Sequence, residues 1–166
     1  MNDVWGSLIS LLTEMLDIYK LLLSLSEKKR DILVNNQVQE LELITRQEEA
    51  SIVQVGKLTV RREKIMKELA GMYGIAGKVD LSKLRQLAPP LTVGQLDKLT
   101  GELKHIAEEL ARLNKLNAEL TEQAQNIINY SINLLAQTAT GPTYAPQGQD
   151  GKSAEAHKKV MFDWKV

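Results

Sequence analysis

Apolar residues recur every three or four positions through the first 34 residues of the chain. One row consists of Trp5, Leu8, Leu12, Met15, Tyr19 and Leu22, and a neighbouring row consists of Val4, Leu11, Ile18, Leu25 and Ile32. Two adjacent rows form a stripe wide enough to contact two other helices. The pattern predicts an amphipathic helix over residues 4–34 that ends before Asn35-Asn36, a pair typical of a break.

A second helix is predicted over residues 38–72, with a less regular apolar face. Its expected buried row is Val38, Leu41, Thr45, Glu48, Ile52, Val55, Thr59, Arg62, Met66 and Leu69. Gly71, Gly74 and Gly77 supply stop signals. Residues 74–91 then form a connector, in which residues 80–87 can form a short helix that Pro89-Pro90 terminates.

The clearest pattern predicts a third long helix over residues 93–139. Thr92 and Gln95 have the spacing of a capping box at its start. The heptad row that follows is Leu96, Leu99, Leu103, Ile106, Leu110, Leu113, Asn117, Leu120, Ala124, Ile127, Ser131 and Leu134. Asn117 and Ser131 are its polar interruptions. Three stripes of near-heptad spacing predict long helices packed at a shallow angle.

The fold class expected from these elements is all-α. We expect an elongated antiparallel three-helix coiled-coil-like bundle over residues 1–140 and an irregular C-terminal tail over residues 141–166, where Gly and Pro replace the helical period. The tail ends with Phe162 and Trp164, and two aromatic residues in a polar segment indicate docking. The docking surface is either the chain's own bundle or a partner.

Composition excludes several functional classes. The 166 residues include 21 basic and 21 acidic side chains, so a basic surface for nucleic acid is not expected. No cysteine is present, which excludes disulfides and thiolate chemistry. Glu14 and Asp17 interrupt the apolar stretch from Leu8 to Leu25, so we expect no signal peptide and no membrane insertion. The expected location is cytoplasmic.

Candidate catalytic chemistry is sparse. Glu102 and His105 have the i, i+3 spacing of a di-iron ligand pair, but a second such pair is missing because the other histidine, His157, lies in the tail. No phosphate-binding glycine loop or nucleophile elbow occurs. We therefore expect a protein that is not an enzyme, with no catalytic residues, no metal and no cofactor. A carboxylate-metal enzyme is the alternative.

The third helix is longer than the other two, so its end should extend beyond them. The expected overhang runs from Leu120 to Leu135 and carries Ile127, Ile128, Ile132, Leu134 and Leu135. An exposed apolar helix end of this kind marks an interaction site, and a partner helix can complete the bundle there. Self-association into a homo-oligomer, or cover by the tail, would also bury it.

Several stretches of the chain resemble the FlgN family of flagellar export chaperones. One is residues 22–33, followed by a break and the pattern Leu-x-x-Ile-Thr-x-x-Glu that begins at Leu41. The other is the tail, with Thr143 to Gln149, a polar run and then Met161-Phe162-Asp163. The resemblance covers nearly the whole chain.

The resemblance implies a concrete function. Members of this family bind the hook-associated proteins of the hook–filament junction in the cytoplasm, prevent their premature assembly and deliver them to the type III export gate. Their substrate-binding region is the C-terminal helix, which here corresponds to residues around Ile127 to Leu135. A tyrosine just after that helix engages the cytoplasmic domain of the export gate, and Tyr144 lies at the matching place.

Two further expectations accompany this assignment. A chaperone must also release its substrate, and we expect Asn117, Ala124 and Ser131 to weaken the binding row for that purpose. The alternative function from the residues alone is a structural coiled-coil scaffold or an assembly regulator without an export role.

Overall fold

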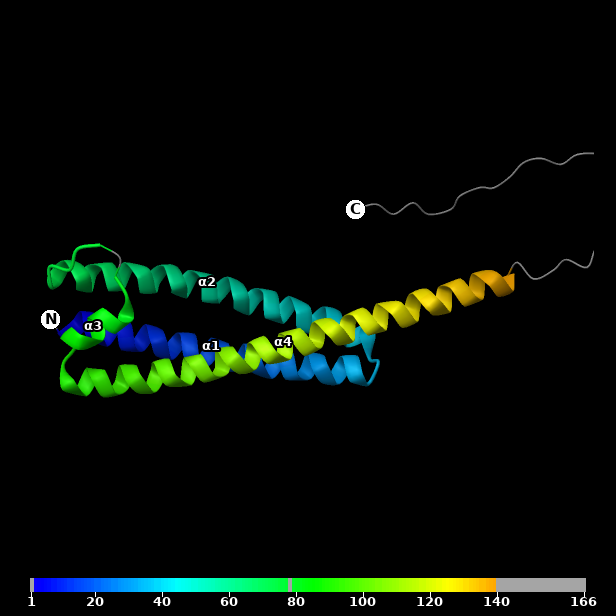
Figure 1. Cartoon of the computed structure of the whole chain (residues 1–166), viewed down its shortest axis with the longest axis horizontal. Coiled ribbons are helices and arrows are strands. Elements are labelled where there is room, and N and C mark those ends of the chain that lie inside the picture. Colours follow the sequence, from blue (N-terminus) through cyan, green and yellow to red (C-terminus); the bar gives the residue numbers. More distant parts are fainter. Residues whose placement is uncertain (1, 78, 140–166) are drawn as a thin grey trace, which may run out of the picture. The chain divides into compact units, whose positions relative to one another are not determined.

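The structure, a computed structural model, describes residues 2–77 and 79–139 and consists of helices joined by short connections (Figure 1). The long helices are α1 (Asn2–Val34), α2 (Leu41–Met72) and α4 (Pro90–Ala139). The short elements are the 3-10 helix η1 (Val38–Glu40) and the helix α3 (Leu81–Leu87). No strand occurs in these two ranges, and the predicted all-α bundle is confirmed. The tail predicted at residues 141–166 lies outside the described residues.

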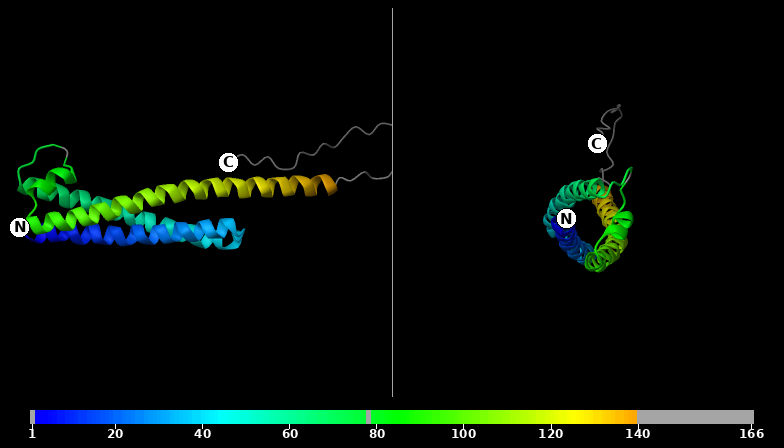
Figure 2. Two further views of the ribbon diagram at one scale, coloured as in Figure 1. Left: turned by 60° about the horizontal axis from the view of Figure 1, so that its bottom comes forward. Right: turned by 90° about the vertical axis from the view of Figure 1, so that its left-hand side faces the viewer.

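The chain divides into two units, Met1–Tyr130 and Ser131–Val166. The first unit contains the bundle, in which α2 runs antiparallel to α1 while α4 runs parallel to α1 (Figures 1 and 2). This direction follows from the contacts, because Leu96 shares a buried cluster with Trp5 and Asn117 bonds to Ser26. Of the second unit, the structure describes residues 131–139, which form the last turns of α4.

The core of the bundle begins at the N-terminal end of α1, where all four α-helices contribute. Leu8, Leu11 and Leu12 are at most 1 % exposed, and they share a cluster with Leu58 and Leu69 of α2, Leu84 of α3 and Leu96 of α4. The Trp5 indole N–H donates a hydrogen bond to the Tyr73 hydroxyl at 3.2 Å. Both rows predicted on α1 are buried, since each supplies residues to this cluster and to those that follow.

The buried face of α2 differs from the predicted row. Val38 and Ile52 are 45 % and 59 % exposed, whereas Ile44, Ser51 and Leu58 are buried. These three residues are spaced by seven, as expected for a helix packed at a shallow angle. The prediction was wrong at these positions because polar and apolar residues alternate along the middle of α2, and packing against α1 selects the face. Ser51 is tolerated there because its hydroxyl donates to the Gln47 carbonyl at 2.9 Å.

The turns between helices use residues that accept a left-handed backbone. Asn36, in the predicted break, has a φ of 58°, a conformation that asparagine adopts at lower energetic cost than most residues. Gly74, one of the predicted stop signals, has a φ of 66° directly after α2. These two positions therefore end α1 and α2 for the local reason expected from the sequence.

Helix α4 begins earlier than the capping box predicted. Its first residue is Pro90, where a missing N–H has no energetic cost because the first turn lacks acceptors anyway. The Val93 N–H already donates to the Pro89 carbonyl at 3.0 Å, so Thr92 lies within the helix. Arg85 of α3 pairs with Asp97 of α4 at 2.6 Å between Nη2 and Oδ2, and this hydrogen bond lowers the pKa of Asp97. The pair links the short helix to the start of the long one.

Candidate functional site

The burial of α4 changes along its length within the first unit. Leu96, Ile106, Leu110 and Leu113 are each at most 8 % exposed, and Asn117 is 4 % exposed. From Thr121 to Tyr130 no residue is buried. The apolar face of α4 therefore divides into a part that forms the bundle core and a part that solvent reaches.

The reason for this change is the length of α1. Because α4 runs parallel to α1 and Asn117 lies beside Ser26, the two helices can be counted together from that level. Helix α1 ends at Val34, eight residues beyond Ser26. Helix α4 therefore passes the end of α1 near residue 125. The core cluster of Leu25, Ile32 and Ile44, which extends from beside Ser26 toward the end of α1, joins α1 to α2 and contains no α4 residue.

The predicted binding residues are mostly exposed. In the first unit, Ile127 is 65 % and Ile128 is 47 % exposed. In the second unit, Ile132, Leu134 and Leu135 are 58 %, 49 % and 69 % exposed. Leu120 differs, because it is only partly exposed and lies near the end of the bundle core. Exposure of single apolar side chains is common, but several of them close together along one helix are typical of an interaction site.

Tyr130 was missed by the sequence analysis. It is 68 % exposed and follows Ile127 by three residues, so it lies on the same side of α4. The predicted heptad row does not include Tyr130, because the row continues from Ile127 to Ser131. Aromatic residues are enriched at binding surfaces, and the i, i+3 spacing from Ile127 is the signal that identifies Tyr130.

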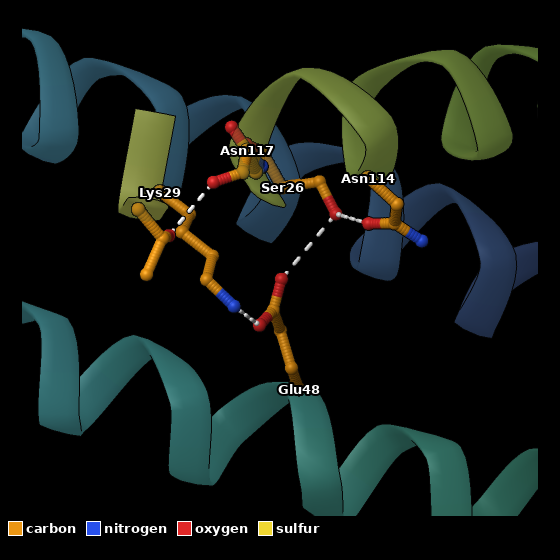
Figure 3. A network of polar contacts seen from close by, with 6 residues as sticks. Ser26, Lys29, Glu48, Asn114 and Asn117 are labelled. Atoms are coloured by element: carbon orange, nitrogen blue, oxygen red, sulfur yellow. Dashed lines mark hydrogen bonds and ion pairs between the residues drawn. The ribbon is translucent and has the colours of Figure 1, made fainter. Parts of the chain in front are cut away.

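A layer of polar side chains crosses the bundle at the last buried level of α4 (Figure 3). Asn117 donates from Nδ2 to the Ser26 backbone carbonyl at 2.9 Å. The Ser26 hydroxyl lies 3.3 Å from Glu48 Oε1 and 3.4 Å from Asn114 Oδ1. Lys29 donates to Glu48 Oε2 at 2.8 Å. We call Ser26, Lys29, Glu48, Asn114 and Asn117 the polar layer.

The polar layer corrects one expectation from the sequence. Asn117 was expected to weaken the substrate-binding row, but it lies inside the bundle and bonds to α1. The reason is that the overhang begins later than the predicted Leu120. Ala124 and Ser131 do lie in the part of α4 where no residue is buried.

Grooves flank the polar layer. One, of about 530 Å³, lies between the three long helices. Its walls contain Tyr19, Leu22, Ile52, Val55, Ala107, Leu110 and Ala111, with four polar-layer residues at its end. A second groove of about 430 Å³ continues along α4 past Asn117 to Gln125. Lys29 and Asn114 line both grooves, so the polar layer marks the boundary between them.

The candidate catalytic and metal residues do not converge. Glu102 pairs with Lys20 at 3.5 Å, and His105 is exposed. Within residues 2–77 and 79–139, no three His, Cys, Asp or Glu side chains gather as they would around a metal ion. His157 and Tyr144 lie outside the described residues. In the same two ranges, no helix is both long and apolar enough to cross a lipid bilayer.

Comparison with known proteins identifies a family. A family model described as FlgN protein matches residues 1–152, which is most of the chain. No curated protein and no solved structure matches it.

Proposed function

This chain belongs to the FlgN family of flagellar type III export chaperones, and from that premise we propose that it binds hook-associated junction proteins through the end of α4. In this proposal the chaperone binds these subunits in the cytoplasm, prevents their premature assembly and delivers them to the export gate. FlgN is a chaperone family, and its members act by binding flagellar proteins.

The observation that supports this binding site is the exposed apolar end of α4. In the second unit, Ile132 and Leu135 are 58 % and 69 % exposed and are three residues apart in the helix, so they lie on one face. Full burial of an isoleucine side chain contributes about 1.5–3 kcal/mol. Leucine contributes a similar amount, and both side chains are already partly covered. A partner that covers both therefore gains about 2–4 kcal/mol from them, which is more than tenfold in Kd.

The occupant that fits this surface is an amphipathic helix. A helix that lays an apolar face along this part of α4 would match its i, i+3 spacing. Axial flagellar subunits assemble through terminal helical segments in the family picture, so a junction protein would present such a helix. Ala124 and Ser131 leave the row incomplete, and we propose that this permits release at the gate.

Delivery to the gate is assigned to the region that follows α4. We propose that Tyr144 contacts the cytoplasmic domain of the export gate, as the matching tyrosine of the family does. The chaperone would then use α4 for the substrate and the next segment for the export machinery. A homo-oligomer formed through the same apolar face is the competing state, and substrate binding would displace it.

The test is binding of a purified hook-associated junction protein by isothermal titration calorimetry. Replacing Ile132 and Leu135 with serine removes apolar area from the proposed site, and we expect at least a tenfold weaker Kd. The matched control replaces Val53 and Val60 of α2, which are 58 % and 68 % exposed, with serine. This control should bind like the parent protein. Equal binding by both variants would contradict the proposed site.

A further inference from the structure

The polar layer contains the one serine and the one asparagine that interrupt the buried rows of α1 and α4. On α1, the row Trp5, Leu12, Tyr19, Ser26 and Leu33 is apolar except for Ser26, which is 2 % exposed. On α4, the row Leu96, Leu103, Leu110 and Asn117 is apolar until Asn117, which is 4 % exposed. The two interruptions lie at the same level and bond to each other (Figure 3).

This arrangement costs stability. Asn117 Oδ1 is buried and has no hydrogen-bond partner among the described residues. A buried acceptor without a partner is unfavourable, whereas a leucine at this position would add to the core. A buried asparagine in a helical bundle commonly specifies one alignment of the helices at the expense of stability.

Apolar packing of the second row of α4 does not by itself select one alignment with α1. The second row of α4 is Leu99, Ile106, Leu113, Leu120, Ile127 and Leu134, and it is apolar at every heptad. If α4 slid by seven residues along α1 in either direction, the positions of Ile106, Leu113 and Leu120 would each receive another large aliphatic side chain. The contacts of this row would therefore be similar in both alignments, and their energies differ little.

The polar layer distinguishes the alignments. A slide of seven residues in one direction would place Asn117 beside Tyr19 and Leu22, where no polar layer group could bond to it. A slide in the other direction would place Leu110 beside Ser26 and Glu48. Each alternative leaves more buried polar groups without partners than the observed alignment.

We propose that the pairing of Asn117 with Ser26 is a positioning device that sets the register of α4 against α1. By fixing that register, it determines which residues of α4 form the core and which lie past the end of α1. The inference rests on the bundle alone, and it holds whether or not the exposed end binds a junction protein.

Pulsed electron–electron double resonance between two spin labels tests the register directly. The chain has no cysteine, so Glu27→Cys and Lys98→Cys create two labelling sites, both exposed, one on α1 and one on α4. The parent protein should give one distance. Asn117→Leu should add a second population whose distance differs by about 10 Å, the rise of seven helical residues.

Two further variants make the result decisive. Asn117→Ala removes the amide without adding a large side chain, and it should also give two distances; it serves alone if the leucine variant does not fold. Asn126→Leu makes the same change at an exposed position of α4 outside the polar layer and should keep the single parent distance. A single unchanged distance after loss of the Asn117 amide would overturn the proposal. A second distance in Asn126→Leu would overturn it as well.

Discussion

At the scale of single residues, burial follows the spacing of apolar side chains wherever that spacing is unambiguous. Leu8, Leu11 and Leu12 are buried as predicted because the two rows of α1 leave no other apolar face. Leu91 shows the opposite case: it is 81 % exposed although it is a large aliphatic residue. Its position in the first turn of α4, ahead of the core residue Leu96, leaves it without neighbours to pack against.

Replacement of Leu8 and of Leu91 with alanine should have very different effects on the free energy of unfolding. Leu8→Ala leaves a cavity in a fully buried cluster and should destabilise the protein by about 2–5 kcal/mol. This corresponds to a fall in Tm of roughly 5–15 °C for a chain of this size. Leu91→Ala makes the same chemical change and should leave Tm within about 2 °C of the parent. Thermal melts followed by circular dichroism at 222 nm measure both, and equal shifts would refute the assignment of Leu8 to the core.

At the scale of elements, α4 combines two roles that the same repeat encodes. Its buried residues extend up to Asn117, and none of the residues from 121 to 137 is buried. The difference arises because α1 and α2 end, and not because the repeat of α4 changes. The three buried clusters of the bundle contain no residue beyond Leu113. Stability and partner binding should therefore be separable by length.

Truncation after Leu120 should preserve stability and abolish partner binding. The shortened chain keeps every residue of the buried clusters and the polar layer, so its thermal transition should stay cooperative, with Tm within a few degrees of the parent. Capture of a hook-associated junction protein in co-purification should be abolished, because the proposed binding residues beyond Leu120 are gone. Truncation after Ala139 retains α4 and is the control, which should still capture. Capture by the shorter chain would show that the binding site lies elsewhere.

At the scale of the whole molecule, the FlgN match extends past α4 to residue 152, so the family resemblance includes the segment with Tyr144. The proposed function assigns substrate binding to α4 and gate contact to that segment. If the two activities belong to different segments, single substitutions should affect them independently. Two tyrosines, Tyr130 in α4 and Tyr144 after it, allow the same substitution in each.

Tyr144→Ala should spare binding of the junction protein while weakening binding to the purified cytoplasmic domain of the export gate at least tenfold. Tyr130→Ala should do the reverse, because Tyr130 is exposed beside Ile127 on the proposed substrate surface. Calorimetric titration of each variant with each partner gives the four values required. Loss of both activities in the Tyr144 variant would mean that this tyrosine has a structural role.

Local patterns were sufficient to predict the long helices, their breaks and the all-α bundle. Strict heptad spacing identified the buried rows of α1 and α4, and Asn36 and Gly74 ended helices through their own backbone preferences. The exposure of Ile127, Ile128, Ile132, Leu134 and Leu135 was also expected from the sequence, because they are apolar residues near the end of the longest helix. These features depend on neighbours within a few turns of the same chain segment.

Tertiary packing decided which residues are buried wherever the local pattern left more than one choice. The sequence alone did not determine which face of α2 is buried, because its middle offers both Ile52 and Ser51, and contact with α1 buries the serine. Nor did it determine that Asn117 belongs to the core, since its place depends on the level at which α4 lies beside Ser26. Helix formation follows from short-range periodicity, whereas burial depends on where a second helix ends, and that is a property of the assembled bundle.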